Sequence, residues 1–461
     1  MSLQPITIEE IEQATGGRLL RGNRKDGVSS VSTNSREVKK GSLFVPIIGE
    51  KVDAHRFIPM AIDSGAAAVF TQEHEKAQDD NAAWIKVRDT REALQKLAAY
   101  YRRKIGLPVI GITGSVGKTS TKDMVSACLS GAKRVMKTAG NQNSQIGVPL
   151  TMFRMDKSFD LAVVEMGMSE FGEMQRLSAI ASPNRAIVTN IGISHIEQLK
   201  TQENIRKEKL HIIDSFDENG VLYLNGNDRL LAALMGTLPC KTVYYGTESF
   251  CDVRAENSKT FENATEFTLV CGNLKEKITL PVLGEHNVFN ALAAIAVARD
   301  IGLTMEEIQR GLSSYQSAAM RQQVSRVGDI TLIDDTYNAS PDSVKSAVGV
   351  LLSMNNKGKK VAVLADMLEL GDYAQSAHTE VGEFCANMGV DFVVTVGELS
   401  RFIAQGATQA GVTHCRDFDN NEKAIEYLKR ELRAGDAVLI KGSRGMHCDE
   451  IVKALQVHFD K

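Results

Sequence analysis

The most chemically informative segment of the sequence is PVIGITGSVGKTS, residues 108–120, where glycines, a lysine and hydroxyls follow a β-branched apolar run. Glycines let successive backbone N–H groups converge on phosphate oxygens, and the start of a helix favours negative charge. A lysine at this place can reach the β- and γ-phosphates, and the next hydroxyl can hold Mg²⁺. The segment predicts a nucleoside triphosphate site formed by Gly114, Ser115, Val116, Gly117, Lys118, Thr119 and Ser120.

The spacing of this segment departs from the common phosphate-loop pattern G-x-x-x-x-G-K-[ST]. Ile112 stands where the first glycine is expected, and Gly114 lies closer to the lysine, so a shortened loop is predicted. The competing interpretation is a glycine turn with a surface lysine. The strand before the turn and the G-K-T-S run after it favour the phosphate loop.

Two later apolar runs also end in groups that could bind a metal. Glu165 closes LAVVE, and His195 follows AIVTN at the end of NIGISH. Ligands of an open parallel sheet bind beyond the carboxyl ends of its strands, so both side chains would face the nucleotide if their strands flank the phosphate-loop strand. A carboxylate suits Mg²⁺, whereas a lone histidine is more often a cap or a packing residue. Lys207 and Lys209 follow on an amphipathic segment, where solvated lysines are the usual case.

The elements that must position these groups alternate between strand-like and helical runs. Residues 1–87 predict a small α/β unit with strands near Lys40–Gly41, and a new unit starts around Asp89. Residues 88–313 predict a mostly parallel sheet with a buried helix near 291–302, and residues 314–461 a second doubly wound sheet. The expected fold is α/β with three domains at 1–87, 88–313 and 314–461.

Composition excludes several other classes of protein. The 461 residues carry a formal charge of −3 with 43% hydrophobic and 24% charged residues, so a nucleic-acid binder and a disordered chain are not expected. No apolar run approaches the roughly 20 residues of a membrane span. The seven dispersed cysteines predict reduced thiols, and the N-terminal sequence lacks a signal-peptide pattern, so a cytoplasmic location is expected.

The ordered motifs TGSVGKTS, EMGM, NIGISH and the lysine-bearing helix resemble the Mur ligase superfamily, which makes ATP-dependent peptide bonds on peptidoglycan precursors. The resemblance covers essentially the whole chain. STNSREVKKGSLFVPIIGEKVDAHRF resembles the uridine-nucleotide module of that family. IDDTYNASPDS, VLADMLELG and VLIKGSRGM resemble the branch that adds D-alanyl-D-alanine to UDP-N-acetylmuramoyl-tripeptide. The D-N-P-R motif of the related diaminopimelate- or lysine-adding ligase is absent.

The resemblance implies roles for individual residues. Lys118, Lys209, His195 and Arg321 would be catalytic. Magnesium would be held by Thr119, Glu165, His195 and Lys209, with Lys209 carried as a carbamate and two Mg²⁺ bound; Lys207 stays open as the alternative. The resemblance also places ATP against Asn287, Asn290, Arg321 and Asp335, and substrate against Ser35, Arg36, Asn141, Asn143, Tyr337 and Asn338.

Each of these assignments has a simpler alternative. Asn287 and Asn290 could be helix caps, Asp335 a turn residue, and the KGSRG segment with Lys441 a solvated loop. The family usually has an aspartate where this chain has Asn34, so an acidic group at the uridine site is lost while hydrogen bonding is kept. The C-terminal domain is expected to bind the dipeptide and close on ATP.

Rival functions remain open at this point. Another amide ligase of the superfamily, including a folylpolyglutamate synthase-like enzyme, would share the phosphate loop but not a uridine module. A non-ligating phosphate-loop switch would hydrolyse nucleotide without the two substrates. The chain is expected to act as a monomer on small molecules. The sequence leaves open whether the tripeptide carries diaminopimelate or lysine, and how the domains are oriented at rest.

Overall fold

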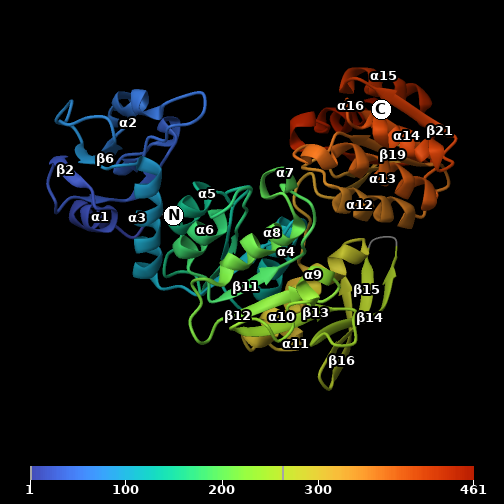
Figure 1. The fold of residues 1–461 in the computed structure, drawn as a ribbon, viewed down its shortest axis with the longest axis horizontal. Helices are drawn as coiled ribbons and strands as arrows, with labels where there is room; N and C mark the ends of the chain where they lie inside the picture. Colours follow the sequence, from blue (N-terminus) through green and yellow to red (C-terminus); the bar gives the residue numbers. More distant parts are fainter. Residues whose placement is uncertain (1–2, 262–263, 461) are drawn as a thin grey trace.

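The computed structural model describes residues 3–261 and 264–460 and divides them among three successive sheets (Figure 1). The N-terminal part and the C-terminal part both stand against the central part, on different sides of it. Three α/β units in this order are what the alternation of strand-like and helical runs predicted. The domain boundaries at 87/88 and 313/314 themselves stay a prediction.

The N-terminal unit is built on a five-stranded sheet in the order β2-β7-β6-β5-β4. Strands β4 (Ser30–Ser32) and β5 (Ser42–Phe44) are the strands expected near Lys40–Gly41, and they pair in parallel. The remaining elements of this unit are β1 (Ile6–Thr7), α1 (Ile8–Thr15), β2 (Arg18–Arg21), β3 (Gly27–Val28), η1 (Ser35–Glu37), η2 (Ala54–Phe57), α2 (Ile58–Asp63), β6 (Ala66–Thr71) and β7 (Ala83–Lys86).

Helix α3 (Thr90–Ile105) connects this unit to the central one. Asp89 caps its N-terminus by accepting from Glu92 N, and Gly106 ends it in the left-handed conformation at φ 74°. Its buried face includes Leu94, Leu97 and Tyr101, and it packs on α1 as well as on helices of the central unit. Helix α3 therefore links the two units, and the start of the new unit near Asp89 stays a prediction.

The central sheet has nine strands in the order β16-β15-β14-β13-β12-β11-β8-β10-β9. Its parallel part, from β9 to β14, is buried between helices, as its unbroken apolar runs require. The elements up to the last parallel crossover are β8 (Val109–Thr113), α4 (Lys118–Leu129), β9 (Val135–Lys137), α5 (Gly147–Met152), β10 (Leu161–Glu165), α6 (Glu173–Ala181), β11 (Arg185–Val188), α7 (Ile196–Leu199), α8 (Gln202–Leu210), η3 (His211–Ile213), β12 (Val221–Asn225), α9 (Arg229–Ala232) and β13 (Lys241–Gly246).

Strand β8, which leads into the phosphate loop, lies between β10 and β11. Glu165 pairs in register with Ile112 on one side, and Val188 with Thr113 on the other. The carboxyl ends of all three strands therefore meet at one edge of the sheet. This adjacency was the condition for Glu165 and His195 to face the nucleotide, and the structure meets it.

The polar stretch after residue 252 extends the same sheet as antiparallel strands, namely β14 (Val253–Thr260), β15 (Thr265–Cys271) and β16 (Leu274–Leu280). Helix α10 (Glu285–Asp300) follows and is the predicted buried helix. It packs on α4, and α11 (Met305–Ser313) packs on α4 as well. The helix that begins at Lys118 therefore packs against both α10 and α11.

The C-terminal unit is the predicted doubly wound domain, with six strands in the order β17-β18-β22-β19-β20-β21. The strands from β18 to β21 are parallel and β17 is an antiparallel edge. Its elements are β17 (Gln323–Val327), β18 (Ile330–Asp334), α12 (Pro341–Ser353), β19 (Lys360–Ala365), η4 (Gly371–Tyr373), α13 (Ala374–Asn387), β20 (Phe392–Val396), α14 (Arg401–Gln409), β21 (His414–Phe418), α15 (Asn421–Glu431), β22 (Ala437–Lys441), η5 (Arg444–Met446) and α16 (Asp449–Phe459).

All seven cysteines are free thiols, as their scattered spacing predicted. Within residues 3–261 and 264–460, no helix combines the length and the apolar character that crossing a bilayer demands.

Candidate functional site

A cavity of about 630 Å³ lies at the carboxyl edge of the central sheet and is closed on one side by the C-terminal domain. Sixteen of the predicted site residues line it: Ser115, Val116, Gly117, Lys118, Thr119, Ser120, Asn141, Asn143, Glu165, His195, Asn287, Asn290, Arg321, Asp335, Tyr337 and Asn338. The structure thus brings residues from two domains to one cavity. Gly114, Lys209, Ser35 and Arg36 are not in its wall.

The shortened phosphate loop is held in place by the neighbouring strand end. Gly114 has φ +147°, and a Cβ there would lie 1.9 Å from Thr189 Oγ1, so only glycine fits. Ser115 N and Val116 N donate to the backbone and side-chain oxygens of Asn190, at 3.0 and 2.8 Å. Gly117 then takes φ +83° directly before α4 begins at Lys118. These contacts hold the backbone of the loop in this conformation.

Glu165 forms the polar centre of the site. Its carboxylate accepts hydrogen bonds from Thr119 Oγ1 at 2.9 Å and from Asn143 Nδ2 at 2.8 Å, and it is almost fully buried. Its backbone N–H donates to Thr138 Oγ1. A carboxylate beside a hydroxyl is the oxygen donor set that Mg²⁺ prefers. The residues present therefore fit a magnesium ion.

Lys122 is a member of this cluster that the sequence reasoning missed. It lies one turn after the phosphate loop, is buried, and places Nζ 3.9 Å from Glu165 Oε2 and 3.5 Å from Asp123 Oδ1. Nζ also donates to Thr138 O at 3.2 Å. Thr138 therefore connects the lysine with the backbone of Glu165. The sequence pattern that could have identified Lys122 is its position three residues after Thr119, which places both on the same face of α4.

Lys118, which is half-buried, and Lys209, which is buried, are two amines near each other. Lys118 Nζ donates to Gly114 O at 2.8 Å and to Ser115 O at 3.1 Å. Burial lowers the pKa of Lys118; Glu165 opposes this shift and Arg321 adds to it. Burial and the positive charge of Lys118 hold the pKa of Lys209 well below its ordinary value, against the opposing effect of Glu208. Lys209 is 1% exposed and Lys207 is exposed, so the solvated interpretation holds for Lys207 alone.

His195 lies on the cavity wall in an unusual backbone conformation, with φ +61°. Its Nδ1 is 2.9 Å from Glu369 Oε2, which belongs to the C-terminal domain. The histidine therefore does line the same cavity as Thr119 and Glu165. Its observed partner is Glu369, an acidic residue that the sequence did not indicate.

The C-terminal domain contributes a second charged group through Arg321. Its Nη2 donates to Thr119 Oγ1 at 2.9 Å, and its guanidinium carbon lies 4.0 Å from the centre of the Tyr337 ring. Stacking on an aromatic face fixes a guanidinium while leaving its donors available. A side chain 202 positions away from Thr119 thereby reaches the phosphate loop.

Asp335 is paired with Lys441 at 2.6 Å, and both are buried. Burial raises the pKa of Asp335, while Lys441 acts in the opposite direction. Ser443 is also buried and accepts from Leu368 N. The interpretations of Asp335 as a turn residue and of Lys441 and Ser443 as a solvated loop are therefore wrong. The solvated interpretation holds for Arg444 of the same segment, which is exposed. Lys441 ends strand β22, so the strand-end rule that selected Glu165 could have found it.

Asn287 and Asn290 are not helix caps. The N-cap of α10 is Gly284, which makes no side-chain capping bond. Asn287 Oδ1 accepts from Asn290 Nδ2 at 3.0 Å, and Asn290 Oδ1 accepts from Thr121 Oγ1 at 2.8 Å. Two amides on one face of α10 are thereby locked against α4 at the cavity wall.

Ser35 and Arg36 lie in η1 of the N-terminal unit, away from this cavity. Asn34 caps η1: its Oδ1 accepts from Arg36 N and its Nδ2 donates to Glu37. Ser35 is buried, whereas Arg36 is exposed. The amide that replaces the family's aspartate thus has a local structural role.

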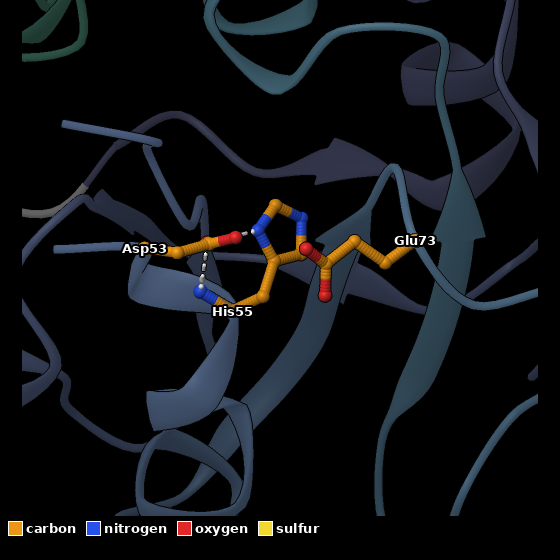
Figure 2. Close-up of side chains that lie close together, drawn as sticks. All are labelled: Asp53, His55 and Glu73. Atoms are coloured by element: carbon orange, nitrogen blue, oxygen red, sulfur yellow. Dashed lines mark hydrogen bonds and ion pairs between the residues drawn. The ribbon is translucent and has the colours of Figure 1, made fainter. Parts of the chain in front are cut away.

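A second cavity, of about 420 Å³, lies in the N-terminal unit and includes Asp53, His55 and Glu73 (Figure 2). Their ligand atoms lie within 4.8 Å of one another. However, His55 Nδ1 is bound to Asp53 Oδ1 at 2.7 Å, and its Nε2 accepts from Gln72 N at 3.2 Å. Since both ring nitrogens are engaged, the imidazole has no lone pair for a cation. The hydrogen bonds of this cluster instead stabilise the start of η2.

Family comparisons cover most of the chain. Residues 27–102 match the model described as "Mur ligase family, catalytic domain", residues 112–298 match "Mur ligase middle domain", and residues 320–444 match "Mur ligase, glutamate ligase domain". These three matches fall on the three sheets in order.

Individual relatives are similar over nearly their whole length. The UDP-N-acetylmuramoyl-tripeptide--D-alanyl-D-alanine ligase of Bacillus subtilis is 39% identical and aligns over 97% of this chain and 98% of its own. A crystal structure of MurF from Acinetobacter baumannii has a TM-score of 0.91 at 31% identity and covers 99% of each chain. MurF ligase from Thermotoga maritima, solved in complex with ADP, has a TM-score of 0.84 at 28% identity, over 94% of this chain and 98% of that one.

Proposed function

The chain belongs to the Mur ligase family, and on that premise we propose that it is an ATP-dependent ligase that joins D-alanyl-D-alanine to UDP-N-acetylmuramoyl-tripeptide. This reaction is a step in the synthesis of peptidoglycan precursors. It releases ADP and phosphate. The proposal was already the expectation from the ordered motifs of the sequence.

One observation carries the proposal. The hydroxyl of Thr119, directly after the phosphate-loop lysine, donates to Glu165 and accepts from Arg321 of the C-terminal domain. Phosphoryl transfer needs cations and donors that surround a triphosphate from several sides. A site that is completed by a second domain is suited to transfer that must exclude water.

Thr119, Glu165 and His195 are proposed as the residues that hold Mg²⁺. When bound, the ion would offset the negative charge of the triphosphate and of the approaching carboxylate. Lys118 would move from its carbonyl partners to the β- and γ-phosphates. Asn287, Asn290 and Asp335 would bind the nucleoside portion of ATP, and the remaining loop residues its phosphates.

Lys209 is proposed as a carbamate. A neutral amine can attack CO₂ with loss of a proton, and burial beside Lys118 favours the neutral amine. The resulting carbamate anion would be attracted by the nearby ammonium of Lys118, whereas a protonated Lys209 would be repelled by it. Its negative charge would suit a second Mg²⁺. Exposed Lys207 has no such environment.

The chain's own side chains then account for the steps. A carboxylate oxygen of the tripeptide attacks the γ-phosphorus of ATP, the bond to the β-phosphate oxygen breaks, and ADP leaves. Lys118 and Arg321 stabilise the charge that develops. The amine of D-alanyl-D-alanine attacks the acyl phosphate, and the tetrahedral intermediate loses phosphate and a proton to give the amide.

The substrate contacts of this reaction are proposed from the cavity wall. Asn141 and Asn143 would lie beside the tripeptide carboxylate, since Asn143 already bonds to Glu165. Tyr337 and Asn338 would contact the dipeptide from the C-terminal domain. Ser35 and Arg36 would bind the uridine nucleotide. Monomeric state and a cytoplasmic location stay predictions.

Phosphate release from ATP tests this function. The purified chain is incubated with ATP and Mg²⁺, with each substrate alone, and with both together. A ligase releases phosphate in proportion to amide formed, and only when UDP-N-acetylmuramoyl-tripeptide and D-alanyl-D-alanine are both present. Release without either substrate would instead identify a nucleotide switch, and release with another amine would identify a different amide ligase. Diaminopimelate and lysine forms of the tripeptide are compared in the same assay.

A further inference from the structure

We propose that Glu369 is a positioning residue for His195, through which docking of the C-terminal domain completes the metal site. This inference rests on the proposed function, because it assigns His195 to the metal. It adds a residue from a different domain, in the segment DMLELG.

The contact joins two loops across the domain interface. His195 Nδ1 lies 2.9 Å from Glu369 Oε2, and the two side chains are 29% and 66% exposed. A polar contact with this degree of exposure contributes little to stability. Its contribution to stability is therefore too small to explain why both partners adopt strained backbones.

Both partners have strained backbones. His195 has φ +61° and Glu369 has φ +63°, in the left-handed region that residues with a Cβ rarely adopt. Each costs of order 1 kcal/mol or more, and such residues persist where surrounding structure holds them. Two strained residues in contact across an interface indicate that both loops adopt these conformations in order to form the contact.

The loop of Glu369 is anchored within its own domain. Met367 N donates to the buried His378 Nε2 at 2.9 Å, and Leu368 N donates to Ser443 Oγ at 2.9 Å. Next to it, a Cβ on Gly371 would lie 3.0 Å from Glu197 Cγ of α7. Helix α7 lies on the side of the central domain that faces the C-terminal domain (Figure 1) and contacts η4. The position of Glu369 is therefore fixed relative to the rest of the C-terminal domain.

The chemical effect of the contact is on the imidazole. A carboxylate that accepts from Nδ1–H fixes the tautomer and leaves the lone pair on Nε2. It also makes that nitrogen a better electron donor and restricts rotation of the ring. His195 thus becomes a competent ligand when the C-terminal domain is docked, and a poorer one when it is not.

The test measures metal binding and not turnover. Affinity for Mn²⁺, used as a spectroscopic substitute for Mg²⁺, is measured by electron paramagnetic resonance on the full chain with a non-hydrolysable ATP analogue. Glu369→Ala is expected to weaken it about 10- to 100-fold. Glu369→Gln, whose amide oxygen still accepts from Nδ1–H, is expected to lie between Glu369→Ala and the unaltered chain. Asp372→Ala, an exposed acid of the same loop, is the matched control and should bind Mn²⁺ normally.

A second readout reports the tautomer directly. In ¹⁵N-histidine-labelled protein, the His195 signal, assigned by its loss in a His195→Gln variant, should show a proton on Nδ1. In Glu369→Ala this preference should disappear while thermal unfolding stays unchanged. Unaltered Mn²⁺ affinity in Glu369→Ala, or a proton on Nε2 in the original chain, would overturn the proposal. Dipeptide-dependent phosphate release by the unaltered chain would still support the ligase, so the two inferences fail separately.

Discussion

At the scale of single residues, the site depends on a few charged groups held in low-dielectric surroundings. Lys118 is half-buried near Arg321 and Glu165, and its present partners are two carbonyls of its own loop. An ammonium on the cavity wall with such replaceable partners can exchange them for phosphate oxygens. Lys209 lies near Lys118, and it adds a second positive charge unless Lys209 is neutral or carbamylated.

Replacing Lys118 with alanine is expected to abolish ligation and ATP turnover together, by at least about 10³-fold, because the triphosphate loses its fixed cation. Coupled phosphate release and product formation are measured on the same samples. Lys133→Ala, on the surface beyond the end of α4, serves as control. Full ligase activity in Lys118→Ala would refute the role of this lysine.

Lys209→Ala is expected to be inactive and to recover part of its activity when acetate or another short-chain carboxylate is added. The small anion would replace the carbamate in the space left by the side chain. Activity is titrated against carboxylate concentration, with Lys207→Ala in parallel as an active control. If no concentration restores activity, the carbamate is not supported.

At the scale of elements, α3 fixes the N-terminal unit to the central one through Glu10 of α1. Glu10 accepts from Tyr100 OH and Lys104 Nζ, each at 2.6 Å, and from Thr7 N at 2.8 Å. Burial alone would raise the pKa of Glu10, but these hydrogen bonds lower it to about 2. The ionised carboxylate therefore ties α1 to α3.

Glu10→Gln is expected to lower the free energy of unfolding at neutral pH by roughly 1–3 kcal/mol, since hydrogen bonds to a charged group are lost. Because the folded pKa of Glu10 is about 2 and its ordinary value 4.5, its contribution is complete above pH 4.5 and disappears as pH falls towards 2. Urea unfolding is compared at pH 7 and below pH 3. The difference between variant and original chain should shrink at the lower pH; Glu9→Gln, its exposed neighbour, should show no such difference.

At the scale of the whole molecule, the cavity is complete only because the C-terminal domain stands against the central sheet. Arg321 reaches Thr119, and Glu369 reaches His195. Both contacts cross the domain interface and involve residues that the proposed reaction uses. Residues of both domains therefore meet in this cavity.

Arg321→Ala is expected to lower kcat about 10²- to 10³-fold with little change in affinity for UDP-N-acetylmuramoyl-tripeptide, because the arginine acts when charge develops during transfer. Arg321→Lys should recover only part of the loss, since an ammonium cannot stack on Tyr337 and donate to Thr119 in the same way. Steady-state kinetics and equilibrium binding separate the two effects. A change confined to tripeptide affinity would contradict this role.

Much of this molecule follows from the sequence alone. The phosphate loop, the acid at Glu165 and the three alternating α/β units could be predicted because they depend on local spacing and on a general rule for parallel strand ends. The ordered motifs also predicted the family and its reaction. These signals are local, or repeat along the chain, and need no knowledge of distant neighbours.

Only the tertiary structure decided which side chains meet. It buried Lys209 and left Lys207 in solvent, paired Lys441 with Asp335, and brought Lys122 and Glu369 to groups that the sequence had already selected. Periodicity says which face of an element is buried, but the partner of a buried charge is chosen by packing between elements far apart in the chain. Desolvation and pairing therefore arise only when the domains are folded and docked.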